Sequence, residues 1–129
     1  MEGSAERERF SAAKRAKSFT HAGRGIWIFI RTTHNAWIQL FVFAVVVFFG
    51  WHLHISHTDW ALLVFAAGLV VTAEALNTAI EIDINLTSPE FHPYARDTKD
   101  VAAGAVLIAA LTALCIGVLV FVPYLHTYL

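Results

Sequence analysis

The sequence predicts an all-α integral membrane protein, on the basis of its composition, its apolar runs and the distribution of its charges. Of its 129 residues, 57% are hydrophobic and 15% are charged, and the mean hydropathy is +0.60. A soluble domain carries about 25% charged residues. Three long apolar runs follow a basic N-terminal segment. We therefore expect a single domain over residues 1–129, with one surface helix followed by three transmembrane helices.

The four expected helices differ in composition. Residues 5–33 mix basic side chains with aromatic ones such as Phe19 and Trp27, which is typical of an amphipathic helix on the inner membrane surface. A mitochondrial-type targeting helix is the alternative for this segment, and its acidic residues argue against it. The last apolar run is expected to end as a helix near Pro123 and Tyr124. Transmembrane helices are expected over residues 36–52, 60–86 and 101–125.

The lysines and arginines are distributed very unevenly along the chain. Seven of the nine precede residue 32, and the other two, Arg96 and Lys99, lie between the second and third apolar runs. The connection over residues 52–59 and the C-terminal segment have none. The positive-inside rule therefore predicts a multi-pass protein whose N-terminus and loop at residues 85–100 are cytoplasmic.

The second apolar run ends in EALNTAIEIDIN, residues 74–85, which carries carboxylates into a membrane helix. A charge near the bilayer centre costs about 2.5–3.5 kcal/mol on insertion scales, so a function is expected to offset it. Asp83 points to the opposite side of the helix. At about 100° per residue, one polar stripe contains Glu74, Asn77, Glu81 and Asn85. A structural polar network between helices is the alternative interpretation.

The segment SPEFHPYARDTKD, residues 88–100, follows the stripe as an expected loop rich in charge. Its Lys99 can neutralise phosphate oxygens as a point charge, although a topogenic charge is an equally good interpretation of that residue alone. Carboxylates suit Mg²⁺, above all when the ion also binds substrate phosphates. Together these features predict phosphoryl transfer. No P-loop or kinase glycine-rich loop occurs, so a nucleotide site must be of another kind.

The motifs EALNTAIE, SPEFHP and KDVAAGAVLIAA resemble the prokaryotic diacylglycerol kinase family, which includes the undecaprenol kinases. The resemblance covers nearly the whole chain from about Lys14. It implies a homotrimeric kinase of the bacterial inner membrane that uses Mg²⁺ and transfers the ATP γ-phosphate to a lipid hydroxyl, with no nucleic-acid partner. The acceptor that it implies is undecaprenol or diacylglycerol, and the motifs NTAIE and DVAAGAVL are more similar to the undecaprenol kinases.

The resemblance also implies roles for individual residues. Glu74 matches the catalytic base, Asn77 matches an active-site asparagine, and Glu81 matches a metal ligand. Lys99 is implied both in catalysis and in nucleotide binding. The residues implied in nucleotide binding are His21, Glu90, Phe91, His92, Lys99 and Asp100.

Two departures from the family pattern bear on activity. Thr33, in TTHNAWIQ, stands where the family has a second metal-ligating glutamate, and Asn85 stands where it usually has aspartate. The resemblance thus implies Glu81 and Thr33 as the metal ligands, although a threonine hydroxyl is a weaker Mg²⁺ ligand than a carboxylate. The alternatives to a kinase are a catalytically weakened family member that binds lipid or nucleotide, and a proton- or ion-conducting protein, for which a second polar span is missing.

Overall fold

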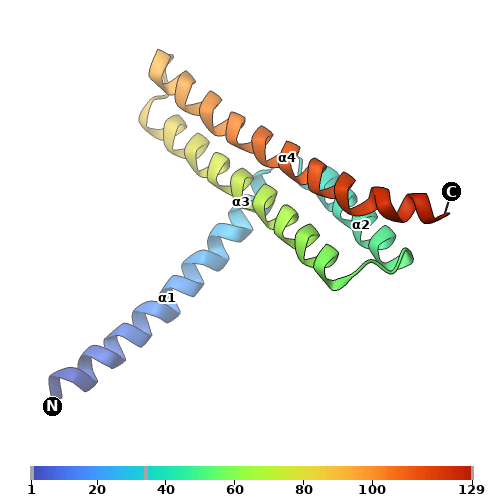
Figure 1. Cartoon of the computed structure of the whole chain (residues 1–129). Helices are drawn as coiled ribbons and strands as arrows, with labels where there is room; N and C mark the ends of the chain where they lie inside the picture. Colours follow the sequence, from blue (N-terminus) through green and yellow to red (C-terminus); the bar gives the residue numbers. More distant parts are fainter. Residues whose placement is uncertain (1, 34, 129) are drawn as a thin grey trace. The chain divides into compact units, whose positions relative to one another are not determined.

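The protein is helical throughout its regular structure, as a computed structural model describing residues 2–33 and 35–128 shows. The helices are α1 (Glu2–Thr32), α2 (Ala36–His52), α3 (His57–Thr87) and α4 (Pro93–Tyr128), as Figure 1 shows. The described residues contain no strand, which confirms the predicted all-helical fold. One structural unit contains α1, and a second contains α2, α3 and α4.

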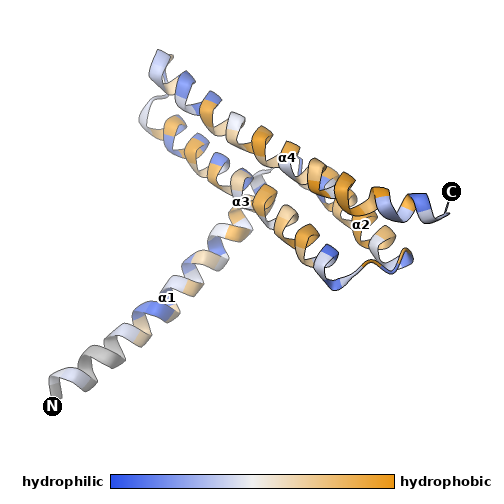
Figure 2. Cartoon of the chain, in the orientation of Figure 1, coloured by the Kyte–Doolittle hydropathy of each residue, from blue (hydrophilic) through white to orange (hydrophobic). Residues whose placement is uncertain are grey.

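The helix α1 presents two sides of different character. Phe19, Ile26 and Ile30 recur at helical spacing and are all exposed. Lys17 and Arg24 project from the other side, and Figure 2 shows this alternation of hydrophilic and hydrophobic residues along α1. The side chains of residues 5–10, where the predicted amphipathic segment begins, lie outside the described residues. Attachment of α1 to a membrane surface stays a prediction.

Two helices of the second unit are long and apolar enough to cross a membrane. They are α3, with 31 residues, and α4, with 36 residues. Figure 2 shows that their middle parts are hydrophobic and that hydrophilic residues gather near their connection. The apolar α2 has 17 residues, the lower end of the range of about 17–25 for a spanning helix. Large apolar side chains such as Phe65 and Leu119 stay exposed, as expected of a small membrane protein.

The start of α4 differs from the prediction. The helix begins at Pro93, well before the expected residue 101, so Lys99 and Asp100 lie on a helix and the connecting loop is only residues 88–92. Proline suits the first helical position because its missing N–H has no helical partner there. The His92 imidazole Nδ1 accepts a hydrogen bond of 3.1 Å from the backbone N–H of Tyr94 and caps the helix.

The end of α4 also differs from the prediction. The helix continues through Pro123 to Tyr128, so the expected helix end at Pro123 is wrong. Proline removes one backbone hydrogen bond and crowds the preceding turn, which bends a helix without always ending it. Figure 1 shows that the axis of α4 changes direction over its last turns.

A small apolar core joins α2, α3 and α4 at the end of the unit remote from the α3–α4 connection. Ile55, Leu63 and Val120 are buried at its centre. The Trp60 ring packs directly on Gly50 of α2, where a Cβ atom would lie 2.7 Å from a ring carbon. Only glycine leaves room for that ring, so this position fixes how closely α2 approaches the start of α3.

Polar contacts tie the start of α3 to the end of α4 beside this core. The Tyr124 hydroxyl donates to Asp59 Oδ2 at 2.6 Å and accepts from the backbone N–H of Ser56 at 3.0 Å. The Ser56 hydroxyl oxygen accepts from the Asp59 backbone N–H at 3.1 Å and caps α3. One tyrosine thus connects the two helices through both a side chain and the backbone.

Replacing Tyr124 by phenylalanine should destabilise the second unit. The Tyr124→Phe change keeps the ring but leaves Asp59 and the Ser56 N–H without their partner, which should cost about 1–3 kcal/mol. The measurement is unfolding in detergent followed by circular dichroism. Tyr128→Phe is the matched control, because that ring is exposed on the same helix. Equal stability of the two variants would contradict the role of this contact.

Candidate active site

The polar stripe of α3 carries unused hydrogen-bonding capacity. Asn77 Nδ2 donates to Glu81 Oε1 at 3.3 Å, across one helical turn, as the predicted register requires. Glu74 Oε2 and Asn77 Oδ1 are shielded from solvent and have no hydrogen-bond partner. Buried polar atoms in folded proteins normally have a partner, so these two oxygens mark a place where a ligand or another chain is expected to supply a donor.

The stripe meets a basic residue at its C-terminal end. Lys99 of α4 donates from Nζ to the side-chain oxygen Oδ1 of Asn85 at 2.6 Å. Asn85 follows Glu81 by four residues, which places the ammonium group about one helical turn beyond the Glu81 carboxylate. The structure therefore brings together Asn85 of α3 and Lys99 of α4, which are 14 residues apart in the sequence.

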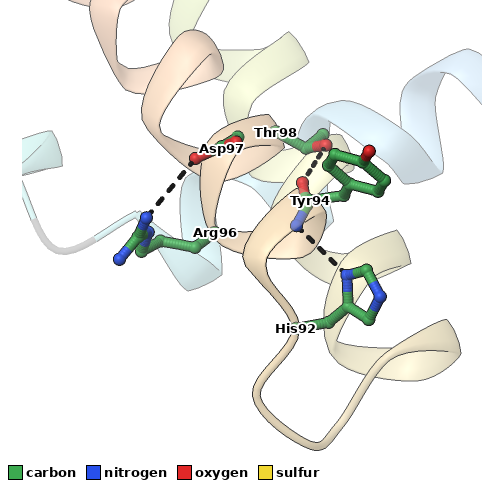
Figure 3. A network of polar contacts seen from close by, with 5 residues as sticks. All are labelled: His92, Tyr94, Arg96, Asp97 and Thr98. Carbon is green, nitrogen blue, oxygen red and sulfur yellow. Dashed lines mark hydrogen bonds and ion pairs between the residues drawn. The ribbon is translucent and has the colours of Figure 1, made fainter.

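The segment before α4 forms a second cluster, next to the start of that helix. Figure 3 shows His92 capping Tyr94 and the ion pair between Arg96 and Asp97, whose charged atoms are 3.8 Å apart. The Arg96 guanidinium lies 5.9 Å from the centre of the Phe91 ring. Phe91 is 78% exposed, so most of its ring remains open to a ligand. The neighbouring Glu90 and, further along α4, Asp100 are also exposed.

A groove of about 880 Å³ runs between α3 and α4. Small and apolar residues at helical spacing line it, among them Leu69, Ala73, Leu76 and Ile80 of α3 and Ala102, Ala105 and Ala109 of α4. Asn77 is the only stripe residue in this lining, which does not include Glu74, Glu81 or Lys99. The groove and the carboxylate stripe are therefore neighbouring but different faces of α3.

Two predicted site residues belong to the unit that contains α1. His21 is exposed on α1. The Thr33 hydroxyl donates to the backbone carbonyl of Phe29 at 2.7 Å, which leaves only its oxygen lone pairs for another partner. Their participation in the site stays a prediction.

Within the described residues, no group of three or more His, Cys, Asp or Glu side chains is placed to hold a metal ion. Magnesium does not require such a cage, because it is usually held by one or two carboxylates together with waters and substrate phosphates. The Glu81 carboxylate suits this role, since it is exposed and only one of its oxygens accepts a hydrogen bond from the described side chains.

Two features of this region are not among the expectations from the sequence. The sequence predicts Lys99 in a loop, which gives no indication that Asn85 is its partner. The groove is the second feature, although its lining residues Ala105, Ile108 and Thr112 recur every three or four positions along α4. That spacing is the signal that predicts a helix face shaped to receive another element.

Comparison with known proteins decides the family. A family model described as "Prokaryotic diacylglycerol kinase" matches residues 20–121. The chain belongs to this family. Undecaprenol kinase of Bacillus subtilis is 39% identical over 109 residues, which cover 84% of this chain and 89% of that protein. Diacylglycerol kinase of Synechocystis is 36% identical over 107 residues, which cover 82% of this chain and 61% of that protein.

A further relative is diacylglycerol kinase of Helicobacter pylori, 29% identical over 106 residues, which cover 77% of this chain and 83% of that protein. No solved structure matches the chain in the same kind of comparison. The matched residues contain the whole polar stripe of α3 and the start of α4. As a member of this family, the chain is a lipid kinase, a phosphotransferase that acts on a lipid alcohol.

Replacing His92 by alanine should loosen the first turn of α4. The imidazole is the acceptor for the Tyr94 N–H, and loss of an N-cap side chain costs about 0.5–2 kcal/mol. We expect faster amide hydrogen exchange at residues 94–97, with the remainder of α4 unchanged. His92→Asn is the matched variant, because asparagine is itself a good N-cap and should restore slow exchange. Equal exchange in all three proteins would show that the cap is not formed.

Proposed function

We propose that the protein transfers the γ-phosphate of ATP to the hydroxyl of a membrane lipid at the cytoplasmic face of the bacterial inner membrane. The observation that carries this proposal is the shielded, unpartnered oxygen of Glu74 on the helix face that leads to Lys99. The Glu74 carboxylate lies within a membrane helix, where a lipid hydroxyl can reach it, and the stripe leads from there to the last turn of α3, where Lys99 of α4 is available to a nucleotide. The family membership supports this choice over ion conduction.

In the proposed mechanism, Glu74 accepts the proton of the lipid hydroxyl as that oxygen attacks the γ-phosphorus and ADP leaves. Asn77 stands one turn from Glu74 and donates from Nδ2 to Glu81, and we assign it to holding the Glu81 carboxylate in place beside the base. Lys99 stabilises the negative charge on the phosphate oxygens. Mg²⁺ held by Glu81 and the phosphates would neutralise further charge on the transferred group.

We assign nucleotide binding to the start of α4 and the segment before it. Phe91 offers an exposed ring for stacking on the base, and the adjoining Glu90 and His92 offer polar groups. Lys99 and Asp100 lie on the following turns of the helix. His21 of α1 is assigned to the same site through the family resemblance.

Undecaprenol is the acceptor that we favour over diacylglycerol. The support is the similarity to undecaprenol kinase of Bacillus subtilis, which extends over 89% of that protein. The decisive experiment is ATP-dependent phosphorylation of undecaprenol and diacylglycerol side by side by the purified protein in mixed micelles. We expect phosphate transfer to undecaprenol at the higher kcat/KM. A preference for diacylglycerol would overturn the acceptor assignment, and transfer to neither lipid would overturn the proposed function.

We also assign three membrane spans, a cytoplasmic N-terminus and a homotrimer. The asymmetric distribution of lysine and arginine supports the orientation, and the apolar α2 supplies the third span. Oligomerisation is supported by the α3–α4 groove, whose Ala102, Ala105 and Ala109 would allow a helix of a second copy to approach closely. A second copy is also a source of donors for the unpartnered oxygens of Glu74 and Asn77.

The variants Glu74→Gln and Glu81→Gln should lose activity in different ways. Glu74→Gln removes the base and should lower kcat about 10²–10⁴-fold, with little change in the KM for ATP. Glu81→Gln removes the proposed metal ligand and should raise the Mg²⁺ concentration needed for half-maximal activity. The measurement is steady-state kinetics over a Mg²⁺ series.

Asp83→Asn is the control for both variants, because Asp83 is an exposed carboxylate on the opposite side of the same helix. Its kinetics should match those of the parent. The role assignments are wrong if Glu74→Gln stays fully active, or if Glu81→Gln keeps the parent's Mg²⁺ dependence.

The second candidate is a catalytically weakened family member, and Thr33 is the residue that favours it. Thr33→Glu should lower the half-maximal Mg²⁺ concentration about tenfold, which corresponds to about 1.4 kcal/mol of binding. Thr32→Glu adds the same charge at the neighbouring position and should not do so. An inactive parent that becomes active with Thr33→Glu would establish this candidate, whereas no response to Thr33→Glu would exclude Thr33 from the metal site.

A further inference from the structure

The contact between Lys99 and Asn85 joins an ammonium group to a neutral acceptor. The two groups are 14 residues apart in sequence and 2.6 Å apart in space, across the α3–α4 connection. Within the part of the chain that the structure describes, no carboxylate oxygen lies within 4.0 Å of Lys99, and the ion pair there is Arg96 with Asp97. Lys99 is therefore held in place without being neutralised by a side chain.

The chemistry of the two groups gives this contact a direction. An ammonium group has three N–H donors, and Asn85 occupies one of them. Asn85 lies in the last turn of α3, where the carbonyl end of the helix dipole favours a cation. These interactions restrict where the ammonium can lie, and they leave its full charge and two donors for an anion.

We propose that Asn85 is a positioning residue that aims the uncompensated charge of Lys99 at the phosphate groups of the nucleotide. This inference rests on the proposed function, because it takes the nucleotide site at the start of α4 as given. An aspartate at this position would form an ion pair with Lys99 and would also repel an incoming phosphate. The neutral amide avoids both effects while keeping the hydrogen bond.

The first part of the test measures the contact without using activity. The chain has three lysines, so the rate of acetylation of Lys99 by acetic anhydride can be compared by mass spectrometry with those of Lys14 and Lys17 as internal references. Asn85→Asp should slow acetylation of Lys99 severalfold, because an ion pair holds the amine protonated. Asp83→Asn, a change of one charge on the other side of α3, should leave the rate unchanged.

The second part measures the effect on the nucleotide. We expect MgATP to protect Lys99 of the parent from acetylation. Asn85→Asp and Asn85→Ala should weaken this protection and raise the KM for MgATP roughly tenfold, with a smaller change in kcat. Thermal unfolding in detergent should be close to that of the parent for Asn85→Asp, so that the KM effect is not an effect on folding.

The possible outcomes separate the inference from the proposed function. Unchanged Lys99 reactivity in Asn85→Asp, or changed reactivity with an unchanged KM, would overturn the positioning role even in an active kinase. Protection of Lys99 by MgATP that is lost in Asn85→Asp supports the inference even if neither lipid is phosphorylated, in which case the proposed function alone fails. A parent in which MgATP does not protect Lys99 overturns the inference.

Discussion

The antiparallel packing of α3 against α4 is the constraint on which the rest of the second unit depends. Apolar contact between helices gives little driving force in a lipid environment, so polar contacts and close packing have to fix their register. A polar contact lies near each end of the pair: Tyr124 with Asp59 at one, and Lys99 with Asn85 at the other. A shift of α4 by one turn, about 5.4 Å, would separate both pairs. The same register holds the start of α4 beside the polar stripe.

The sequence predicts the elements well where composition changes sharply. The bounds of α2 agree with the prediction because polar residues flank a continuous apolar run. The start of α4 was missed because residues 93–100 are polar and resemble a loop, although Pro93 and the cap at His92 favour a helix there. The expected helix end at Pro123 is wrong because a proline within a long apolar helix can bend the helix without ending it.

In the candidate site, contacts within one helix follow from the sequence, whereas contacts between helices do not. The facing of Asn77 and Glu81 follows from a spacing of four residues, and the structure contains that hydrogen bond. The pairing of Lys99 with Asn85 depends on the register of two helices, which hydropathy does not encode. The shielding of Glu74 Oε2 depends on how far α3 is rotated about its axis. These two features therefore emerge only from the packed structure.

The two departures from the family pattern act on the same charge balance. Thr33 and Asn85 both stand at positions where the resemblance implies an acidic residue. The chain therefore brings fewer negative charges to a site proposed to bind a polyphosphate. Fewer carboxylates should weaken Mg²⁺ binding by the protein, but they also reduce repulsion of the phosphates. With Asn85 as its partner, Lys99 keeps its full charge for those phosphates. Under the proposed function, part of the neutralisation would shift from the metal ion to the lysine, so the loss of an acidic residue at 85 is compatible with phosphoryl transfer.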